Sequence, residues 1–224
     1  KPFEKKGAKL LVLPSKHTTV FINDYLKNNP DERKESVGTL AGSFTEDELK
    51  NLKLDVLYLG MITAGEVDLE ILEWLVESAE ITILDVQGLF RSVEAGVLRH
   101  SLPDGLQKAV KGIHILKANS LEARFLTNKH DLQDAIKCMY DWGVGEVVVT
   151  CGSEGSLVYD GQNIHQIPSC RYGKFVDATG CGDTYLAAYL SQRLKGQAIP
   201  EAGKFAAMLA GKKTEVMGAL DLSE

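Results

Sequence analysis

The sequence predicts an α/β fold with a mostly parallel central sheet, helices on both of its faces and a small β-rich appendage near the start. From residue 45 to residue 151, short apolar runs of strand length alternate with segments of helical periodicity. This alternation is typical of βαβ units, whose strands form a parallel sheet. Before residue 44 the pattern is instead β-rich, with no intervening helix. A chain of 224 residues, 44% of them hydrophobic, has room for one sizeable core.

The β-rich part is predicted as a short buried strand followed by a two-stranded flap. Ala8–Leu13 is apolar, whereas Thr18–Leu26 largely alternates in polarity and indicates a two-faced strand. Lys27–Glu35 is charged and contains Asn-Pro-Asp, so we expect an exposed turn there. Ser36–Ala41 would then return antiparallel to the preceding strand.

The α/β part begins with Thr45 and Glu48, whose spacing predicts a capping box for a short helix through Leu52. The predicted strands are Asp55–Leu59, Ile81–Val86, Ile113–Leu116 and Glu146–Thr150, with a hairpin of Ser156–Tyr159 and Ile164–Ile167. The predicted helices are Glu66–Ala79, Pro103–Val110, Ser120–Leu126, Leu132–Trp142, Gly182–Leu194 and Ile199–Lys213. Ligands of such sheets bind beyond the carboxyl ends of the strands, so the polar residues there are the candidate site.

Composition excludes several classes of partner. A formal net charge of -6 argues against general binding to nucleic acid or to an anionic membrane. The longest apolar runs are too short to cross a bilayer, and no signal peptide is recognisable at the start. The four cysteines form no CxxC pair and have no histidine partners at zinc spacing. They indicate reduced thiols, and we expect a cytoplasmic protein.

A glycine turn at Asp177–Asp183 opens a predicted helix and is the leading candidate site. Gly180 and Gly182 allow the backbone to curl around an anion, and the start of a helix offers unpaired N–H groups. Asp183 would then lie beside a bound phosphate, where a carboxylate could accept a proton from an attacking hydroxyl. Equally, Thr179 or Asp183 could simply cap the helix, with the glycines supplying the turn.

Three further polar clusters follow predicted strands. Asn119 and Glu122 could hold a metal-bound water or form a helix cap. Thr150, with Gly152 and Gly155, could cradle a phosphate or form a tight turn. Asp85, followed by Gln87 and Arg91, could contact a substrate or cap the next segment. All four clusters together, at one edge of one sheet, favour a phosphate-handling site.

These residues, taken in order, resemble the ribokinase-like (PfkB) family of sugar and nucleoside kinases. Asp177-Ala178-Thr179-Gly180-Cys181-Gly182-Asp183 is similar to the family pattern Asp-Thr-x-Gly-Ala-Gly-Asp, with Cys for Ala. Asn119–Glu122 resembles Asn-x-x-Glu, and Thr150–Gly155 resembles Thr-x-Gly-x-x-Gly. The Gly-Cys-Gly-Asp variant, Asp85–Arg91 and Thr18–Phe21 resemble a branch that contains inositol- and cytidine-kinase-like enzymes.

The resemblance implies a three-layer ribokinase-like α/β/α fold and a role for each matched residue. Asp183 would be the catalytic base, and the amides of Gly180, Cys181 and Gly182 would form the anion hole. Asn119 and Glu122 would position Mg²⁺ against ATP. The remaining implied positions fall into two groups: Thr150, Gly152, Gly155, Asp177, Thr179 and Ala207 on the nucleotide side, and Thr19, Phe21, Gln87 and Arg91 on the substrate side.

The implied organisation is a single domain over 1–224, with a β-flap at 15–43 and a nucleotide-binding core at 44–218. In relatives the flap covers the sugar site and often pairs with a second subunit, so a homodimer is expected. The family's early acidic sugar contact and its Gly-Gly…Asn motif have no match in residues 1–60. We therefore expect a partial chain that lacks an N-terminal part.

The expected function is an ATP-dependent kinase that phosphorylates a small sugar, polyol or nucleoside. The alternative is a non-catalytic sugar- or nucleotide-binding member of the same fold. A dinucleotide-binding oxidoreductase is excluded because no GxGxxG follows an early strand. Lys212 and Lys213, near the end of the last helix, are expected to be solvated, with an approach of Lys213 to phosphates as the alternative.

Overall fold

The computed structural model describes residues 7–26, 29–94 and 96–221. Its main sheet has six strands in the order β10-β9-β8-β7-β4-β3. Four strands run parallel, and the hairpin of β9 and β10 joins them antiparallel to β8 at one edge. The strands are β3 (Val56–Leu59), β4 (Ile81–Asp85), β7 (Ile115–Asn119), β8 (Glu146–Thr150), β9 (Ser156–Tyr159) and β10 (Ile164–Ile167).

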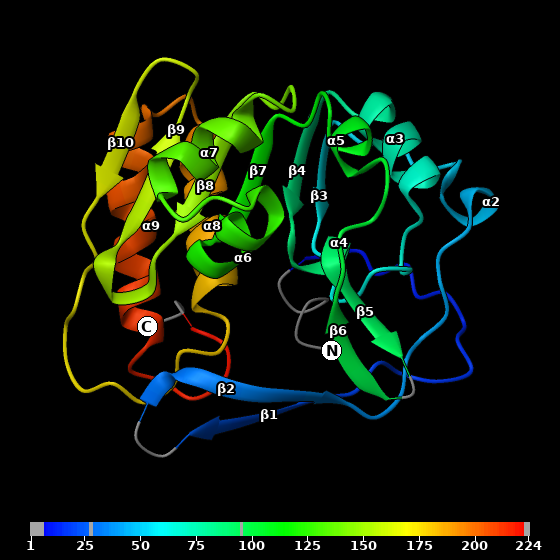
Figure 1. Ribbon diagram of the computed structural model, residues 1–224, viewed down its shortest axis with the longest axis horizontal. Helices are drawn as coiled ribbons and strands as arrows, with labels where there is room; N and C mark the ends of the chain where they lie inside the picture. Colours follow the sequence, from blue (N-terminus) through cyan, green and yellow to red (C-terminus); the bar gives the residue numbers. More distant parts are fainter. Residues whose placement is uncertain (1–6, 27–28, 95, 222–224) are drawn as a thin grey trace.

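Helices cover both faces of this sheet, which confirms the predicted three layers (Figure 1). One face carries α3 (Leu69–Ser78), α5 (Leu106–Ala109), α6 (Ser120–Thr127) and α7 (Leu132–Tyr140). The other carries α8 (Cys181–Arg193) and α9 (Ile199–Lys213). Side chains alternate between the two cores along each strand, as in β7, where Ile115 packs with α8 and α9 while Leu116 packs on the opposite face.

A separate antiparallel ribbon consists of β1 (Phe21–Leu26) and β2 (Asn29–Val37), with Phe21 opposite Val37. Figure 1 shows it crossing beyond the carboxyl ends of the parallel strands. β2 also packs against the hairpin of β5 (Arg91–Glu94) and β6 (Val97–His100). This placement confirms the predicted antiparallel pairing and brings the ribbon to the edge that holds the polar clusters.

Two early predictions are wrong. Ala8–Leu13 forms no strand; it is largely exposed, and in the described residues this apolar run pairs with no other strand. Asn29–Glu35 belongs to β2 rather than to an exposed turn, because hydrogen bonding to β1 stabilises a strand even where its sequence is polar. The predicted return strand, Ser36–Ala41, contributes only Ser36 and Val37 to the ladder. Residues 27–28 of the predicted turn lie outside the described residues.

Later elements were shifted or missed. The helix expected from Glu66 begins at Leu69, because the Glu66 carboxylate turns back to accept from the Thr63 backbone N–H at 3.0 Å and closes a loop instead. The short helices α2 (Glu46–Leu49) and α4 (Gln87–Phe90) and the 3₁₀ turn Gly152–Glu154 complete the described elements. Neither the β5–β6 hairpin nor α4 was predicted from the sequence. No helix in the described ranges combines the length and apolarity that crossing a bilayer requires.

Candidate active site

The Asp177–Asp183 turn delivers an unpaired helix end to the carboxyl edge of the sheet. Gly180 is the N-cap of α8 and has φ of 79°, a left-handed conformation that favours glycine. The Cys181 N–H donates to Ala178 O at 3.1 Å, and the first helical bond runs from Thr184 N–H to Gly180 O at 2.9 Å. Helix geometry therefore leaves the N–H groups of Gly182 and Asp183 without an intrahelical acceptor. They form a candidate anion site, with the exposed Asp183 side chain in the same turn.

Lys213 holds this turn from behind, which overturns the expectation that it is solvated. Its side chain is 2% exposed, and Nζ donates to Asp177 O at 3.3 Å, to Asp177 Oδ2 at 3.4 Å and to Val216 O at 3.1 Å. The other Asp177 oxygen accepts from the Thr179 N–H at 2.9 Å. This N–H bond, followed by the Lys213 charge, lowers the pKa of Asp177. Asp177 therefore shapes the turn.

A cavity of about 480 Å³ opens beside the anion site. Its lining includes four residues predicted on the nucleotide side, together with two from the start of α8: Thr150, Gly152, Gly155, Ala207, Cys181 and Gly182. A Cβ on Gly155, where φ is 95°, would overlap Ile167 O, so this position requires glycine. Asp177 and Thr179 flank the lining residue Ala178 but are not part of the lining themselves. The volume suits a small-molecule ligand.

Four buried charged side chains lie next to the anion site: Asp85, Arg91, Lys117 and Glu122. Lys117 Nζ lies 2.6 Å from Asp85 Oδ2, and Arg91 Nη2 lies 4.0 Å from Glu122 Oε1. Burial opposes the charge on Lys117, but the surrounding carboxylates outweigh it and raise the pKa of the amine. Burial also raises the pKa of Glu122, with Lys117 and Arg91 acting against it. The amine is therefore a fixed positive charge.

Asn119 and Glu122 form a complete capping box for α6. Asn119 Oδ1 accepts from the N–H groups of Leu121 and Glu122, both at 2.9 Å, and Glu122 Oε2 accepts from the Asn119 N–H at 2.7 Å. In the described part of the chain, no three His, Cys, Asp or Glu side chains converge as a metal cluster. The oxygen chemistry suits Mg²⁺, which keeps several waters and binds through one or two carboxylates plus phosphates.

The predicted substrate residues lie in two regions, one at α4 and the start of β5 and the other at the start of the β1–β2 ribbon. Gln87 and Arg91 contact each other, with Arg91 Nη1 donating to Gln87 Oε1 at 3.3 Å. Arg91 Nη2 also lies 4.0 Å from Glu122 Oε1. Thr19 and Phe21 belong to the ribbon and the segment before it, and Thr19 Oγ1 accepts from the Ala41 N–H at 3.0 Å. Thr19 therefore helps to hold the ribbon together.

Sequence reasoning gave no role to Lys117 and misplaced Lys213. The signal for Lys117 was present, because a lysine inside an apolar strand, two residues after Ile115, must face a core. Asp85 was predicted either to cap the next segment or to contact a substrate or phosphate; the structure shows the first use, and the second stays a prediction. Asp85 Oδ1 accepts from the Gln87 N–H at 3.1 Å while Oδ2 pairs with Lys117.

The fold and the helix-end anion site define a class of three-layer α/β proteins that bind ligands at the carboxyl edge of the sheet, and known proteins share this architecture. A pyrophosphate-dependent kinase in the ribokinase family, solved as a sulfate complex, superimposes with a TM-score of 0.88 and 27% identity over 98% of this chain and 78% of that one. Arabidopsis thaliana ribokinase, complexed with ribose and ATP, shares the fold with a TM-score of 0.67 and 22% identity, over 90% of this chain and 64% of that one.

Sequence comparison agrees with the structural comparison. The model of the pfkB family carbohydrate kinases matches residues 7–224, and the chain belongs to this family. The cytidine kinase of Thermococcus kodakarensis is 33% identical over 100 residues, covering 44% of this chain and 36% of that protein. The inositol 3-kinase of Arabidopsis thaliana is 28% identical over 158 residues, covering 69% of this chain and 42% of that protein. The matched region thus spans less than half of either relative.

Proposed function

We propose that the protein is a phosphotransferase that phosphorylates a hydroxyl of a small sugar, polyol or nucleoside, with Asp183 as the general base. The observation that carries this proposal is the start of α8. There an exposed carboxylate shares one helical turn with two N–H groups that lack intrahelical acceptors, and the same turn forms a wall of the cavity of about 480 Å³. A carboxylate beside an anion site serves a reaction that moves a proton next to a phosphate.

In the proposed step, the substrate hydroxyl oxygen attacks the terminal phosphorus of the donor while Asp183 accepts the hydroxyl proton. The new O–P bond forms as the bond from phosphorus to the donor's bridging oxygen breaks, and that oxygen leaves with the electron pair. The N–H groups at the start of α8 stabilise the charge on the transferring phosphoryl oxygens. The names of the relatives, which include cytidine kinase and inositol 3-kinase, support a small polyol or nucleoside acceptor.

ATP is the proposed donor because the cavity has features that suit a nucleoside. Tyr172 and Phe175 contribute aromatic surface, and Ala207 leaves room for a flat base. Mg²⁺, when bound, would neutralise charge on the donor phosphates. Asn119 and Glu122 are the residues that would hold its waters, with Glu122 Oε1 as the carboxylate oxygen outside the capping box.

Pyrophosphate is the second candidate donor, because the pyrophosphate-dependent kinase above covers nearly the whole chain at a TM-score of 0.88. One experiment distinguishes ATP from pyrophosphate as the donor. Turnover is measured with ATP and with pyrophosphate over a panel of sugars, inositols and nucleosides. Activity with pyrophosphate alone would overturn ATP as the donor but leave the transferase assignment intact. No turnover with any pair, together with measurable sugar or nucleotide binding, would favour the non-catalytic alternative.

The role of Asp183 is tested with Asp183→Asn against a matched control, Asp134→Asn. Both aspartates occupy the third position of a helix and are exposed, but Asp134 begins α7 away from the cavity. We expect Asp183→Asn to reduce kcat by a factor of about 1,000, within the range for loss of a general base, with donor affinity and Tm nearly unchanged. Wild-type turnover in Asp183→Asn would overturn the base assignment.

Two further features of the protein belong to the same proposal. All four cysteines are free, which fits a reducing compartment such as the cytoplasm. Pairing of two copies through the β1–β2 ribbon is proposed because Ile22 on the ribbon and Val20 just before it are 48% and 45% exposed. Sedimentation of the wild type against an Ile22→Glu variant tests this pairing.

A further inference from the structure

Lys117 lies where a charge would act directly on the transferred group. It follows Ile115 by two residues on β7, and Ile115 packs into the core with α8 and α9. Alternation along the strand therefore points Lys117 to the same face, one step nearer the carboxyl edge. A Cβ built on Gly182 would lie 3.3 Å from Lys117 Nζ. The amine thus lies against the first turn of α8, where Gly182 and Asp183 present their N–H groups.

The absence of a side chain at Gly182 keeps the space between the amine and the helix end open. Gly182 is helical, with no left-handed φ to explain a glycine there. Alanine would be the better helix former by about 1 kcal/mol. A glycine at this position therefore has a local purpose, and the approach of Lys117 Nζ supplies one.

The ammonium group is held firmly but keeps capacity for a ligand. Asp85, 0% exposed, accepts from Nζ at 2.6 Å and is itself fixed by the Gln87 N–H. An ammonium has three N–H donors, and among residues 7–26, 29–94 and 96–221 Asp85 is the acceptor recorded for it. Two donors therefore remain for an anion at the start of α8. Since a buried ion pair contributes little net stability, a role in ligand binding explains this one better than a role in folding.

We propose that Lys117 is a further catalytic residue of the transfer, whose ammonium contacts a non-bridging oxygen of the phosphoryl group as it moves from donor to acceptor, and that Asp85 is the positioning residue that holds it there. This inference rests on the proposed function. The bond changes are those of the step above, with the proton going to Asp183. Lys117 keeps its protons and supplies charge to the three equatorial oxygens, opposite the N–H groups of α8.

The test compares Lys117→Met with Arg193→Met, which removes a partly buried, ion-paired cation at the opposite edge of the sheet. We expect Lys117→Met to lower kcat about 100-fold, the usual effect of losing one charge-stabilising donor, with the KM for the acceptor within about twofold. Lys117→Arg recovers part of that loss, because it restores the charge. Arg193→Met keeps kcat when assayed below its Tm.

Sulfur substitution tests the contact itself. A donor with sulfur in place of a non-bridging oxygen on the terminal phosphoryl group slows the wild type, because the ammonium binds sulfur poorly. The contact predicts that this rate ratio shrinks in Lys117→Met, whereas a purely structural role leaves it unchanged. Arg193→Met serves as the control that keeps the wild-type ratio.

A variant that removes both charges controls for misfolding, because Lys117→Met alone leaves Asp85 buried and unpaired. The double variant Asp85→Asn/Lys117→Met removes both charges, and we expect it to fold but to stay about 100-fold slower in kcat. Wild-type turnover in the double variant, or an unchanged sulfur effect in Lys117→Met, overturns the role of Lys117 and leaves the kinase assignment standing. Absence of transfer by the wild type overturns the proposed function itself.

Discussion

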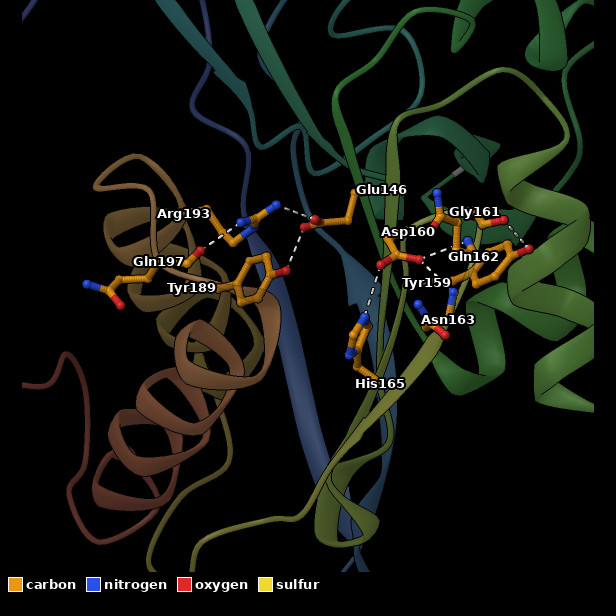
Figure 2. A network of polar contacts seen from close by, with 10 residues as sticks. All are labelled: Glu146, Tyr159, Asp160, Gly161, Gln162, Asn163, His165, Tyr189, Arg193 and Gln197. Carbon is orange, nitrogen blue, oxygen red and sulfur yellow. Dashed lines mark hydrogen bonds and ion pairs between the residues drawn. The ribbon is translucent and has the colours of Figure 1, made fainter.

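The two edges of the main sheet each bury a network of charged side chains, but the networks differ in what the central charged group of each one contacts. At the amino edge, Glu146 at the start of β8 accepts from Tyr189 OH at 2.6 Å and from Arg193 Nη2 at 2.8 Å, one bond to each oxygen (Figure 2). Arg193 Nη1 also donates to Gln197 O at 2.7 Å. At the carboxyl edge, Lys117 has Asp85 as its acceptor among the described residues, while Arg91 donates to Gln87 Oε1 at 3.3 Å and lies 4.0 Å from Glu122.

The difference separates two uses of a buried charge. The Glu146 network links β8 to the end of α8 with both carboxylate oxygens occupied, so it can only hold the helix on the sheet. Burial, followed by the Glu146 charge, raises the pKa of Tyr189 and keeps its phenol a donor. At the carboxyl edge, the Lys117 ammonium has Asp85 as its acceptor among the described residues and lies beside the start of α8. Its other N–H donors face the helix end, and the use proposed for them is ligand binding.

Between the two edges, the largest expected difference comes from exchanging a carboxylate for an amide at each edge. Asp85→Asn should lower kcat about 100-fold because the lysine loses its positioning partner, and it should also lower the free energy of unfolding by about 3 kcal/mol as an unpaired charge is left buried. Glu146→Gln should lower stability by a similar amount while kcat below the Tm stays near the wild-type value. Steady-state kinetics and urea unfolding on both variants measure the two quantities. Equal kinetic losses in the two variants would remove the distinction between the edges.

Lys213 sharpens the comparison because it is buried at the carboxyl edge yet satisfied by three oxygen acceptors. We expect Lys213→Met to lower stability by about 2 kcal/mol, the value of a charged hydrogen bond, and to weaken donor binding about tenfold because the Asp177–Gly180 turn loosens. Calorimetric titration of the donor and urea unfolding measure these effects. Lys212→Met, on the exposed neighbour, is the control. Weaker binding without a loss of stability would contradict the bracing role of Lys213.

Gly182→Ala adds a single methyl group and should lower activity without lowering stability. The new Cβ would crowd Lys117 Nζ at 3.3 Å, so we expect kcat to fall about tenfold. Helix propensity at the same time favours alanine by up to about 1 kcal/mol, so stability should hold or rise. Gly203→Ala in α9 is the matched exchange, since its Cβ would meet Ile167 at 2.7 Å in the core. That variant should lose stability and keep kcat, and the reverse pattern would contradict the assignment of Gly182.

Much of the architecture could be predicted from the sequence because local signals and packing agree there. The apolar runs of β4, β7 and β8 and the long helix Ile199–Lys213 are confirmed, since buried strands and amphipathic helices carry their period in the sequence. Ala8–Leu13 and the polar β2 failed for the opposite reason. Whether such a segment forms a strand depends on a partner strand, and single-segment patterns do not record partners.

The candidate site also contains some features that local sequence predicts and others that depend on distant partners. Asn119, Glu122 and Thr150 were recognised because they stand at strand ends, and the glycine turn because it opens a helix; the structure brings them to one edge. The contacts of Lys117 and Lys213 are long-range: Asp85 and Lys117 are 32 positions apart, and Asp177 and Lys213 are 36 apart. Spacing within one segment cannot pair such residues. The roles of Asp183 and the other site residues stay predictions until they are tested.

The smallest expected effect lies at the amino edge, in the turn between β9 and β10. Asp160 Oδ1 accepts from the N–H groups of Asn163 at 2.6 Å and Gln162 at 2.8 Å, and Oδ2 lies 3.1 Å from His165 Nε2 (Figure 2). The Asn163 N–H is the largest cause that lowers the pKa of Asp160 from 3.8 to about 2. A depressed folded-state pKa stabilises the protein above the unfolded value, and that contribution is lost as the pH falls through the folded value.

The charge of Asp160 should therefore support folding above pH 3.8 and lose its effect as the pH falls toward 2. Because the side chain is 30% exposed, solvent screening limits the gain to about 1 kcal/mol. Asp160→Asn keeps an oxygen for the same N–H bonds, so it should be less stable than the wild type near neutral pH and converge with it toward pH 2. Urea midpoints between pH 6 and pH 2 measure the convergence, and two parallel curves would contradict it. Turnover near neutral pH should not change, because this turn lies at the amino edge, away from the carboxyl edge where the donor is proposed to bind.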